Sequence, residues 1–229
     1  MTTRSRYGFT IILAAGVIGL GYLMASGPRN VVPLSPASGP SPDLLRQILA
    51  DANAPVVGNT AGAVTVVEFF DYRCPYCRAL RPVLENLMAQ DRRVRLVFKE
   101  WPIFGGASVT AARFALAARW QGKYVAVHKA IFGLPSAMDA ASIRQAAMEA
   151  GADMARLDRD LAAHRGEIDM ELARVADEAR ALGFQGTPGL IVGTMAVPGA
   201  LGASELARLI DQLAQNGRRR NPGSAGTAF

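Results

Sequence analysis

Residues 64–78 read VTVVEFFDYRCPYCR, and this stretch decides the fold. Its first seven residues are β-branched or aromatic apart from one acid, which is typical of a buried strand. After Cys74, leucines recur at helical spacing at positions 80, 84 and 87. The sequence therefore predicts a Cys-x-x-Cys motif at the junction between a strand at 64–70 and a helix from residue 75 to about 90.

The position of this motif predicts a reactive cysteine. Cys74 falls near the N-cap of the helix, where unpaired backbone N–H groups and the helix dipole stabilise an anion and lower the pKa of a thiol. Pro75 suits the first helical position because its missing N–H would have no partner there in any case. Cys77 lies one turn further on the same side, close enough to Cys74 to close a small disulfide. A Cys-x-x-Cys in this setting indicates redox chemistry.

A zinc site and a purely structural disulfide are weaker interpretations of the cysteine pair. Zinc needs further thiolate or imidazole ligands, but the chain has two cysteines and two histidines, and His128 and His164 lie far downstream without ligand-like pairing. A structural disulfide across so short a loop removes little entropy from the unfolded chain. We therefore expect no metal and no diffusible cofactor, with Cys74–Cys77 as the redox-active group.

The net charge does not favour nucleic-acid binding. The formal charge is +6, and six arginines near the two ends account for all of it, since neither terminal segment carries an acid. Three lie in residues 1–30 and three in residues 217–229, a Gly/Pro/Ser-rich tail that is predicted to be disordered. A neutral domain with basic ends offers no clustered positive surface to phosphates.

An apolar segment near the N-terminus predicts export. Residues 8–25 are uncharged, and Arg4 and Arg6 precede them. The segment is longer than the usual apolar region of a signal peptide and near the lower limit for a membrane span. We favour a signal anchor within residues 1–26, with a cleaved signal peptide as the open alternative. The positive-inside rule places the remainder outside the cytoplasm in either case. Residues 27–42 are predicted to form an extended Pro/Ser-rich tether.

The order of the predicted elements indicates an α/β domain over residues 43–216. A short helix at 43–52 and an extended piece at 55–58 come before the central strand and its helix, and a second strand follows at 93–99. Helices are then expected between about residues 107 and 183, the first capped by Ser108. The chain returns to a β-hairpin pattern at 190–197 and closes with a helix capped by Ser204.

Several of these features together resemble the DsbA family of thiol–disulfide oxidoreductases. They are Cys-Pro-Tyr-Cys after a VVEFFDY strand, Lys99-Glu100-Trp101-Pro102-Ile103 after the second strand, and Gly186-Thr187-Pro188 before the closing hairpin. The resemblance runs from about residue 55 to residue 215. It implies a thioredoxin-like fold, β-α-β and then β-β-α, with an inserted all-helical subdomain.

The resemblance also implies roles for residues around the motif. Cys74 would be the exposed nucleophile, and Cys77 would be the thiol that resolves a mixed disulfide. Pro188 would be a cis-proline beside the pair, with an ordinary turn proline as the alternative. The Thr187 backbone would pair with an extended substrate strand.

Glu68 is an acid inside a strand that is predicted to be buried on both faces, where a carboxylate is rare unless it is paired or functional. In the resemblance, Glu68 and Lys99 correspond to a buried charged pair that accepts and returns the Cys77 proton. A purely structural ion pair is the alternative. Tyr76 stands where strongly oxidising members of the family have histidine, so we expect a less extreme thiol pKa and reduction potential.

These features lead us to expect a thiol–disulfide oxidoreductase at the extracytoplasmic face of the cytoplasmic membrane or in the periplasm. It would form disulfides in unfolded exported proteins and be reoxidised by a membrane redox partner. A reductase or isomerase of the same fold is the nearest alternative. A non-catalytic thioredoxin-fold chaperone or binding module is the alternative outside enzymes. The direction of redox flux does not follow from the sequence.

Overall fold

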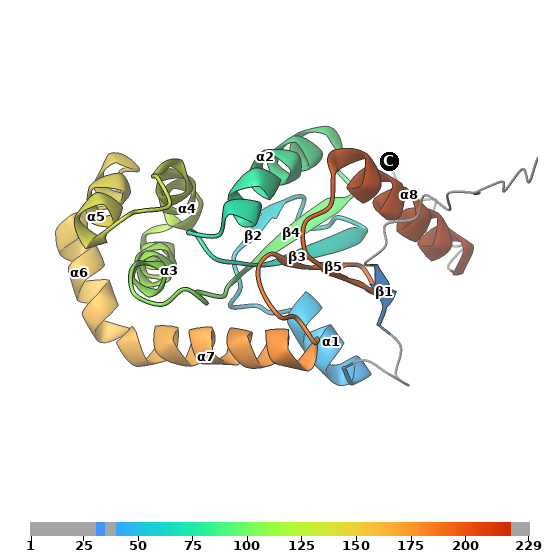
Figure 1. The fold of residues 1–229 in the computed structure, drawn as a ribbon, viewed down its shortest axis with the longest axis horizontal. Coiled ribbons are helices and arrows are strands. Elements are labelled where there is room, and N and C mark those ends of the chain that lie inside the picture. The colour runs from blue at the N-terminus through green and yellow to red at the C-terminus, as the bar shows by residue number, and fades with distance from the viewer. Residues whose placement is uncertain (1–30, 35–39, 221–229) are drawn as a thin grey trace, which may run out of the picture.

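The computed structural model describes residues 31–34 and 40–220, and within them six strands form one mixed sheet. The strand order is β1-β6-β5-β3-β4-β2 (Figure 1). The central strands β3 and β4 are parallel, and the other neighbouring pairs are antiparallel. The strands are β1 (Val32–Pro33), β2 (Val56–Gly58), β3 (Val64–Phe70), β4 (Val94–Glu100), β5 (Gly189–Val192) and β6 (Met195–Pro198).

Helices cover both faces of this sheet and form a separate group beside it (Figure 1). Helices α2 and α8 lie on one face, α1 and α7 lie on the other, and α3 to α6 form the helical insertion. The helices are α1 (Pro42–Leu49), α2 (Pro75–Gln90), α3 (Ala107–Ala117), α4 (Tyr124–Gly133), α5 (Ala140–Glu149), α6 (Met154–Ala163), α7 (Arg165–Ala181) and α8 (Ala203–Arg220). The predicted α/β order with an inserted helical subdomain is therefore confirmed.

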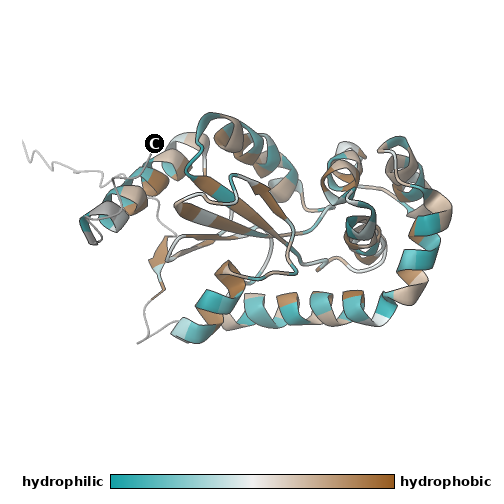
Figure 2. Ribbon diagram, turned by 180° about the vertical axis from the view of Figure 1, so that it is seen from behind, coloured by the Kyte–Doolittle hydropathy of each residue, from teal (hydrophilic) through white to brown (hydrophobic). Residues whose placement is uncertain are grey.

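Strand β3 joins the two hydrophobic cores of the domain. Val66 and Phe70 pack into the core beneath α2 and α8, whereas Val67 and Phe69 pack into the core beneath α1 and α7. Because side chains alternate along a strand, a segment with apolar residues at consecutive positions must be covered on both faces. Figure 2 shows these strands as largely hydrophobic, between helices that alternate hydrophilic and hydrophobic residues.

The predicted tether is partly built into the fold. Residues 27–42 were expected to be extended and unpacked, but Val32 and Pro33 form β1 and pair with Ala196 and Met195 of β6. The Leu34 N–H also donates to the Thr194 carbonyl at 3.0 Å. An edge strand leaves unpaired backbone groups, and β1 covers those of β6. The expectation is wrong for this segment.

Two predicted helix boundaries are also wrong. Gly106, not Ser108, precedes the first turn of α3, because the Ser108 hydroxyl is buried and donates to the Asp71 carboxylate at 2.7 Å. Helix α8 begins at Ala203, which places Ser204 inside it, and it continues to Arg220. The first residues of the predicted disordered tail are therefore helical.

The predicted signal anchor and the end of the tail lie outside the described residues. Over residues 31–34 and 40–220, no helix is long and apolar enough to cross a bilayer.

Candidate active site

The cysteine motif lies where the sequence predicts it, between β3 and α2. Cys74 is the N-cap residue of α2, with an extended backbone (φ −67°, ψ 120°), and Pro75 occupies the first helical position. The Cys74 N–H donates to the Asp71 carbonyl at 3.1 Å, which closes the turn between strand and helix. The side chain at the N-cap makes no capping bond. When Cys74 is ionised, its sulfur can therefore accept hydrogen bonds from the unpaired N–H groups at the N-terminus of α2.

Both cysteines are free thiols, and both are buried. The relative exposure is 2% for Cys74 and 0% for Cys77. The prediction of an exposed nucleophile is therefore wrong, because the Cys74 sulfur lies against the Thr187 carbonyl, to which it donates at 3.1 Å. The exposed member of the motif is Tyr76, with a relative exposure of 67%.

The two thiols differ strongly in acidity. Hydrogen bonding from the Cys77 thiol, from the Thr187 side chain and from the backbone N–H groups of Tyr76 and Cys77 outweighs burial and lowers the pKa of Cys74 to about 6. Burial raises the pKa of Cys77, and its hydrogen bond to Cys74 and the nearby Glu68 carboxyl raise it further. At neutral pH the site therefore holds one thiolate, at Cys74, and one thiol, at Cys77.

A loop from the far end of the chain completes the site. The Thr187–Pro188 peptide bond is cis, as the resemblance implies. Strand β5 follows directly and pairs antiparallel with β3, with Gly189 opposite Phe69. This pairing holds the Thr187 carbonyl against a cysteine 113 residues earlier in the sequence.

Glu68 lies beneath the motif and is 3% exposed. Burial raises the pKa of its carboxyl to about 8, although the positive charge of Arg81 lowers it, and the nearby Cys74 adds to the rise. A carboxyl with this acidity changes its protonation state near neutral pH. The charges of Glu68 and of the cysteines shift one another's pKa, so Glu68 lies within electrostatic range of both thiols.

Lys99 is not part of this group, and its predicted pairing with Glu68 is wrong. In the parallel register of β3 and β4, Glu68 stands opposite Phe98, and Lys99 stands opposite Phe69. Because adjacent residues of a strand point to opposite faces, Lys99 and Glu68 point away from each other across the sheet. The Lys99 ammonium is 1% exposed and bonds the Asp51 and Glu178 carboxylates at 2.6 and 2.9 Å.

Asp71 organises the loops around the motif, a role that the sequence did not indicate. Its carboxylate accepts from the Arg73 N–H at 2.8 Å, the Ser108 hydroxyl at 2.7 Å and the Phe104 N–H at 3.1 Å. These donors come from the motif turn, from α3 and from the loop after β4. In the sequence, Asp71 could be recognised only as an acid that directly follows a buried strand. That position does not predict any of the three donors.

A buried polar cluster between the motif and the insertion was not predicted either. The Glu100 carboxyl accepts from the hydroxyls of Tyr72 and Tyr124, each at 2.8 Å, and His128 Nδ1 lies 3.0 Å from the Tyr72 hydroxyl. Burial raises the pKa of Glu100 well above its usual value and lowers the pKa of His128. The cluster joins β4 and α4 to the turn that carries Cys74.

Across the described residues, no group of three or more His, Cys, Asp and Glu side chains is arranged to hold a metal ion. The chemistry that the arrangement can perform is nucleophilic exchange at sulfur, with a thiolate at Cys74, a second thiol at Cys77 and a titratable acid at Glu68.

Comparisons with known proteins agree with this chemistry. A family model described as a DSBA-like thioredoxin domain matches residues 65–213, which is more than half of the chain. A solved thioredoxin-like oxidoreductase from Silicibacter pomeroyi is 44% identical, with a TM-score of 0.70, over 74% of this chain and 97% of its own. The thiol:disulfide interchange protein DsbA of Bordetella parapertussis is 26% identical over 196 residues, which cover 81% of this chain and 83% of that protein.

A second kind of relative is much longer than this chain. The Na(+)/H(+) antiporter NhaA 1 of Mycolicibacterium vanbaalenii is 25% identical over 181 residues, which cover 78% of this chain and 29% of the antiporter. The chain therefore spans less than a third of the length of that curated relative.

Proposed function

The chain belongs to the DSBA-like thioredoxin domain family, and from this premise we propose that it is an exported thiol–disulfide oxidoreductase that forms disulfides in thiol-containing proteins. The observation that carries the proposal is the contrast between Cys74 and Cys77, of which one is a stabilised thiolate and the other a buried thiol. Stabilising the Cys74 thiolate stabilises the reduced protein and so makes the Cys74–Cys77 disulfide a better oxidant.

In the oxidising direction, a substrate thiolate attacks Cys74 of the disulfide. A bond forms between the substrate sulfur and the Cys74 sulfur, and Cys77 leaves as a thiolate that takes up a proton. A second substrate thiolate then attacks the first substrate sulfur, and Cys74 leaves as the stabilised thiolate. The substrate loses two electrons and the cysteine pair gains them.

The substrate is proposed to be an extended segment of an unfolded protein. The Thr187–Pro188 loop lies beside Cys74 and leads into β5, which supports the proposal that the backbone of residue 187 pairs with a substrate strand that carries a cysteine. A membrane redox partner that reoxidises the pair is part of the same proposal. Export is supported by the arginines and the apolar segment at residues 4–25 of the sequence.

Refolding of a reduced, unfolded substrate with two cysteines tests the proposal. The oxidised protein should introduce the disulfide stoichiometrically, and Cys74→Ala should abolish this activity. Cys77→Ala has no disulfide of its own, so it is first loaded with glutathione on Cys74; a substrate thiolate should then displace reduced glutathione and leave a mixed disulfide between Cys74 and the substrate. Unchanged refolding with Cys74→Ala would instead support a non-catalytic binding module.

Equilibration of the cysteine pair with reduced and oxidised glutathione tests the direction of the reaction. We expect the pair to be largely reduced in a glutathione mixture that leaves structural disulfides oxidised. A pair that stays oxidised in strongly reducing mixtures would assign the protein to the reductases instead.

A further inference from the structure

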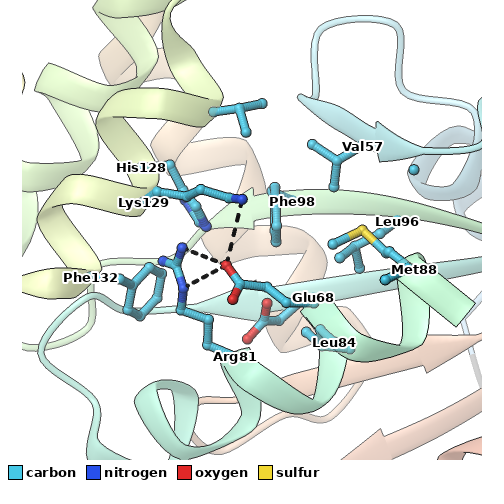
Figure 3. A pocket seen from close by; sticks show the side chains of 14 residues that line it. Val57, Glu68, Arg81, Leu84, Met88, Leu96, Phe98, His128, Lys129 and Phe132 are labelled. Atoms are coloured by element: carbon cyan, nitrogen blue, oxygen red, sulfur yellow. Dashed lines mark hydrogen bonds and ion pairs between the residues drawn. The ribbon is translucent and has the colours of Figure 1, made fainter. Parts of the chain in front are cut away.

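A cavity of about 280 Å³ lies between α2, α4 and the sheet, and Glu68 forms part of its wall (Figure 3). Its walls are mainly apolar side chains, among them Leu84, Met88 and Phe98. The charged or titratable side chains that line it are Glu68 of β3, Arg81 and Glu85 of α2, and His128 and Lys129 of α4. A cavity of this size with several polar groups has room for water.

Two residues of the cavity wall, Glu85 and Lys129, are in contact with solvent, with side chains 40% and 57% exposed. Their charged ends are 3.8 Å apart. Glu68, at the inner wall, is almost fully buried. The cavity therefore connects a buried acid next to the cysteine pair with bulk solvent.

Arg81 lines the same cavity as these residues. Its Nε and Nη2 donate to Glu85 Oε1 at 3.1 and 2.8 Å, and its guanidinium lies over the Phe132 ring at 5.0 Å. In Figure 3 the dashed lines from Arg81 mark its bonds to Glu85, and the dashed line from Lys129 marks the ion pair with the same carboxylate. Its Nη1 is buried and has no hydrogen-bond partner among the described residues. A buried donor without a partner is costly, and a second anion nearby compensates for it.

Glu68 supplies that anion when it ionises. It is the other carboxyl of the cavity wall, and Arg81 is the cation that favours its ionised form. His128 is buried and its pKa is lowered, so it is neutral and adds no charge. Lys129 is exposed, and solvent screens its charge. Lys99, on the opposite face, is held by Asp51 and Glu178.

We propose that Arg81 is a positioning residue for the proton of Cys77: it keeps Glu68 able to ionise, and Glu68 exchanges that proton with the solvent of the cavity. The inference rests on the proposed thiol–disulfide exchange and adds a route for the proton that the exchange moves. Glu85 is the carboxylate that bonds Arg81, and it competes with Glu68 for the positive charge of Arg81.

One proton moves between Cys77, Glu68 and the cavity whether the Cys74–Cys77 disulfide forms or breaks. When Cys77 attacks a mixed disulfide at Cys74, its thiol proton passes to the Glu68 carboxylate, the Cys74–Cys77 bond forms, and the substrate leaves as a thiolate. Glu68 then releases the proton into the cavity. In the oxidising direction Cys77 leaves as a thiolate and takes a proton from neutral Glu68, which regains one from the cavity.

The test uses the full chain carrying glutathione on Cys74, and it measures the rate at which Cys77 releases the glutathione between pH 5 and pH 10. We expect the rate to rise as Glu68 ionises. Arg81→Met should move this rise to higher pH, with about a tenfold slower release at pH 7 for each unit of displacement, and the rates should converge at high pH. Arg81→Lys should restore much of the wild-type profile, and Glu68→Gln should remove the rise.

Two further variants sharpen the test. Lys129→Met removes an exposed positive charge from the same cavity and should leave the pH dependence of the release rate unchanged. Glu85→Gln frees Arg81 from its carboxylate partner, so it should move the rise to lower pH. Circular dichroism shows whether each variant folds. If Arg81→Met does not fold, the pH profile of Glu85→Gln tests the inference instead.

Two results would overturn the inference. One is an unchanged profile in Arg81→Met or in Glu85→Gln. The other is a slowing of Arg81→Met by the same factor at every pH, which would mark Arg81 as structural. Failure of the proposed function looks different: glutathione would then leave a Cys77→Ala variant as fast as the wild type.

Discussion

Glu68 and Lys99 lie on adjacent parallel strands and point to opposite faces of the sheet. Each therefore has its own set of partners. Glu68 faces the cysteine pair, Arg81 and the cavity, whereas Lys99 faces α1 and α7 and bonds two carboxylates there. The acid beneath the active site is consequently tuned from α2, and the lysine of β4 stabilises the other layer of the domain.

Lys99→Met should lower the free energy of unfolding by about 2 kcal/mol, because it removes the buried cation that Asp51 and Glu178 share and leaves these carboxylates only Arg174, which is 40% exposed. Urea denaturation measures the loss. The pH dependence of Cys74 alkylation should stay as in the wild type, since Lys99 lies on the other face. Arg46→Met is the matched control: it removes an exposed pair with Asp43 and should change the free energy by less than about 1 kcal/mol. A shift in Cys74 reactivity with Lys99→Met would contradict the separation of the two faces.

Alkylation of reduced protein with iodoacetamide should follow a single titration near pH 6, the pKa of Cys74. Cys77 should react only after unfolding, because it is buried and its pKa is raised. In Cys77→Ala the midpoint should rise, since the hydrogen bond from Cys77 is the largest cause of the lowered value. A midpoint near 9 in the wild type, the value of an ordinary thiol here, would rule out the stabilised thiolate.

The same pKa makes the stability of the reduced protein depend on pH. The pKa of Cys74 falls from 9.0 to about 6 on folding, so its contribution is fully present above pH 9 and is lost as the pH falls to 6. The melting temperature of the reduced form should therefore rise relative to that of the oxidised form between pH 6 and pH 9. The oxidised form serves as the control, because its sulfurs do not titrate. Parallel curves for the two forms would refute the expected linkage.

Gly189→Ala should destabilise the protein by about 1–3 kcal/mol, because its Cβ would lie 2.5 Å from a carbon of the buried Phe184 ring. Phe184 packs edge-on against Phe69 at 5.6 Å and has no room to retreat. Thermal unfolding measures the effect, and Phe184→Leu in the same chain should recover part of it. Gly186→Ala, in the same loop, meets nothing within 4 Å and should change stability by less than about 0.5 kcal/mol. Equal losses in the two alanine variants would show that the Phe184 contact is not the cause.

Glu100→Gln should fold normally and flatten the pH dependence of stability. Burial raises the pKa of Glu100 well above 4.5 in the folded state, so its contribution is present below pH 4.5 and is lost as the pH rises. Glutamine keeps the acceptor for Tyr72 and Tyr124 without the titration. Glu100→Leu removes that acceptor and should cost on the order of 2 kcal/mol. Urea denaturation of both variants at several pH values measures these free energies of unfolding. If Glu100→Gln loses as much stability as Glu100→Leu, the carboxyl is needed in its charged form.

The strand at 64–70, the helix after Cys74 and the cysteine pair could be predicted because each is encoded within one short segment. Periodicity alone gives the strand and the helix, and the motif stands at their junction. The helical insertion followed in the same way from helix-length segments between two strand patterns.

The errors concern relationships between segments. The pairing of Glu68 with Lys99 failed because the register of two parallel strands is set by packing and cannot be read from either strand alone. The Glu100 cluster draws on β4, α4 and the motif turn, and the three donors to Asp71 come from three separate places. Serine at a helix start often caps the helix, but here the Ser108 hydroxyl donates to the buried carboxylate of Asp71 instead.

The ion pairs of Lys99 decide where the domain can be cut. Asp51 and Glu178 lie 48 residues before and 79 residues after Lys99, so the chain ahead of β2 is part of the folded unit although the family match begins only at residue 65. A recombinant version trimmed to the family match would lack Asp51 and all of α1. It would also lose β2, leave α7 alone on that face of the sheet, and leave Lys99 with one of its two carboxylate partners. Soluble expression and crystallisation are better served by trimming no further than residue 40.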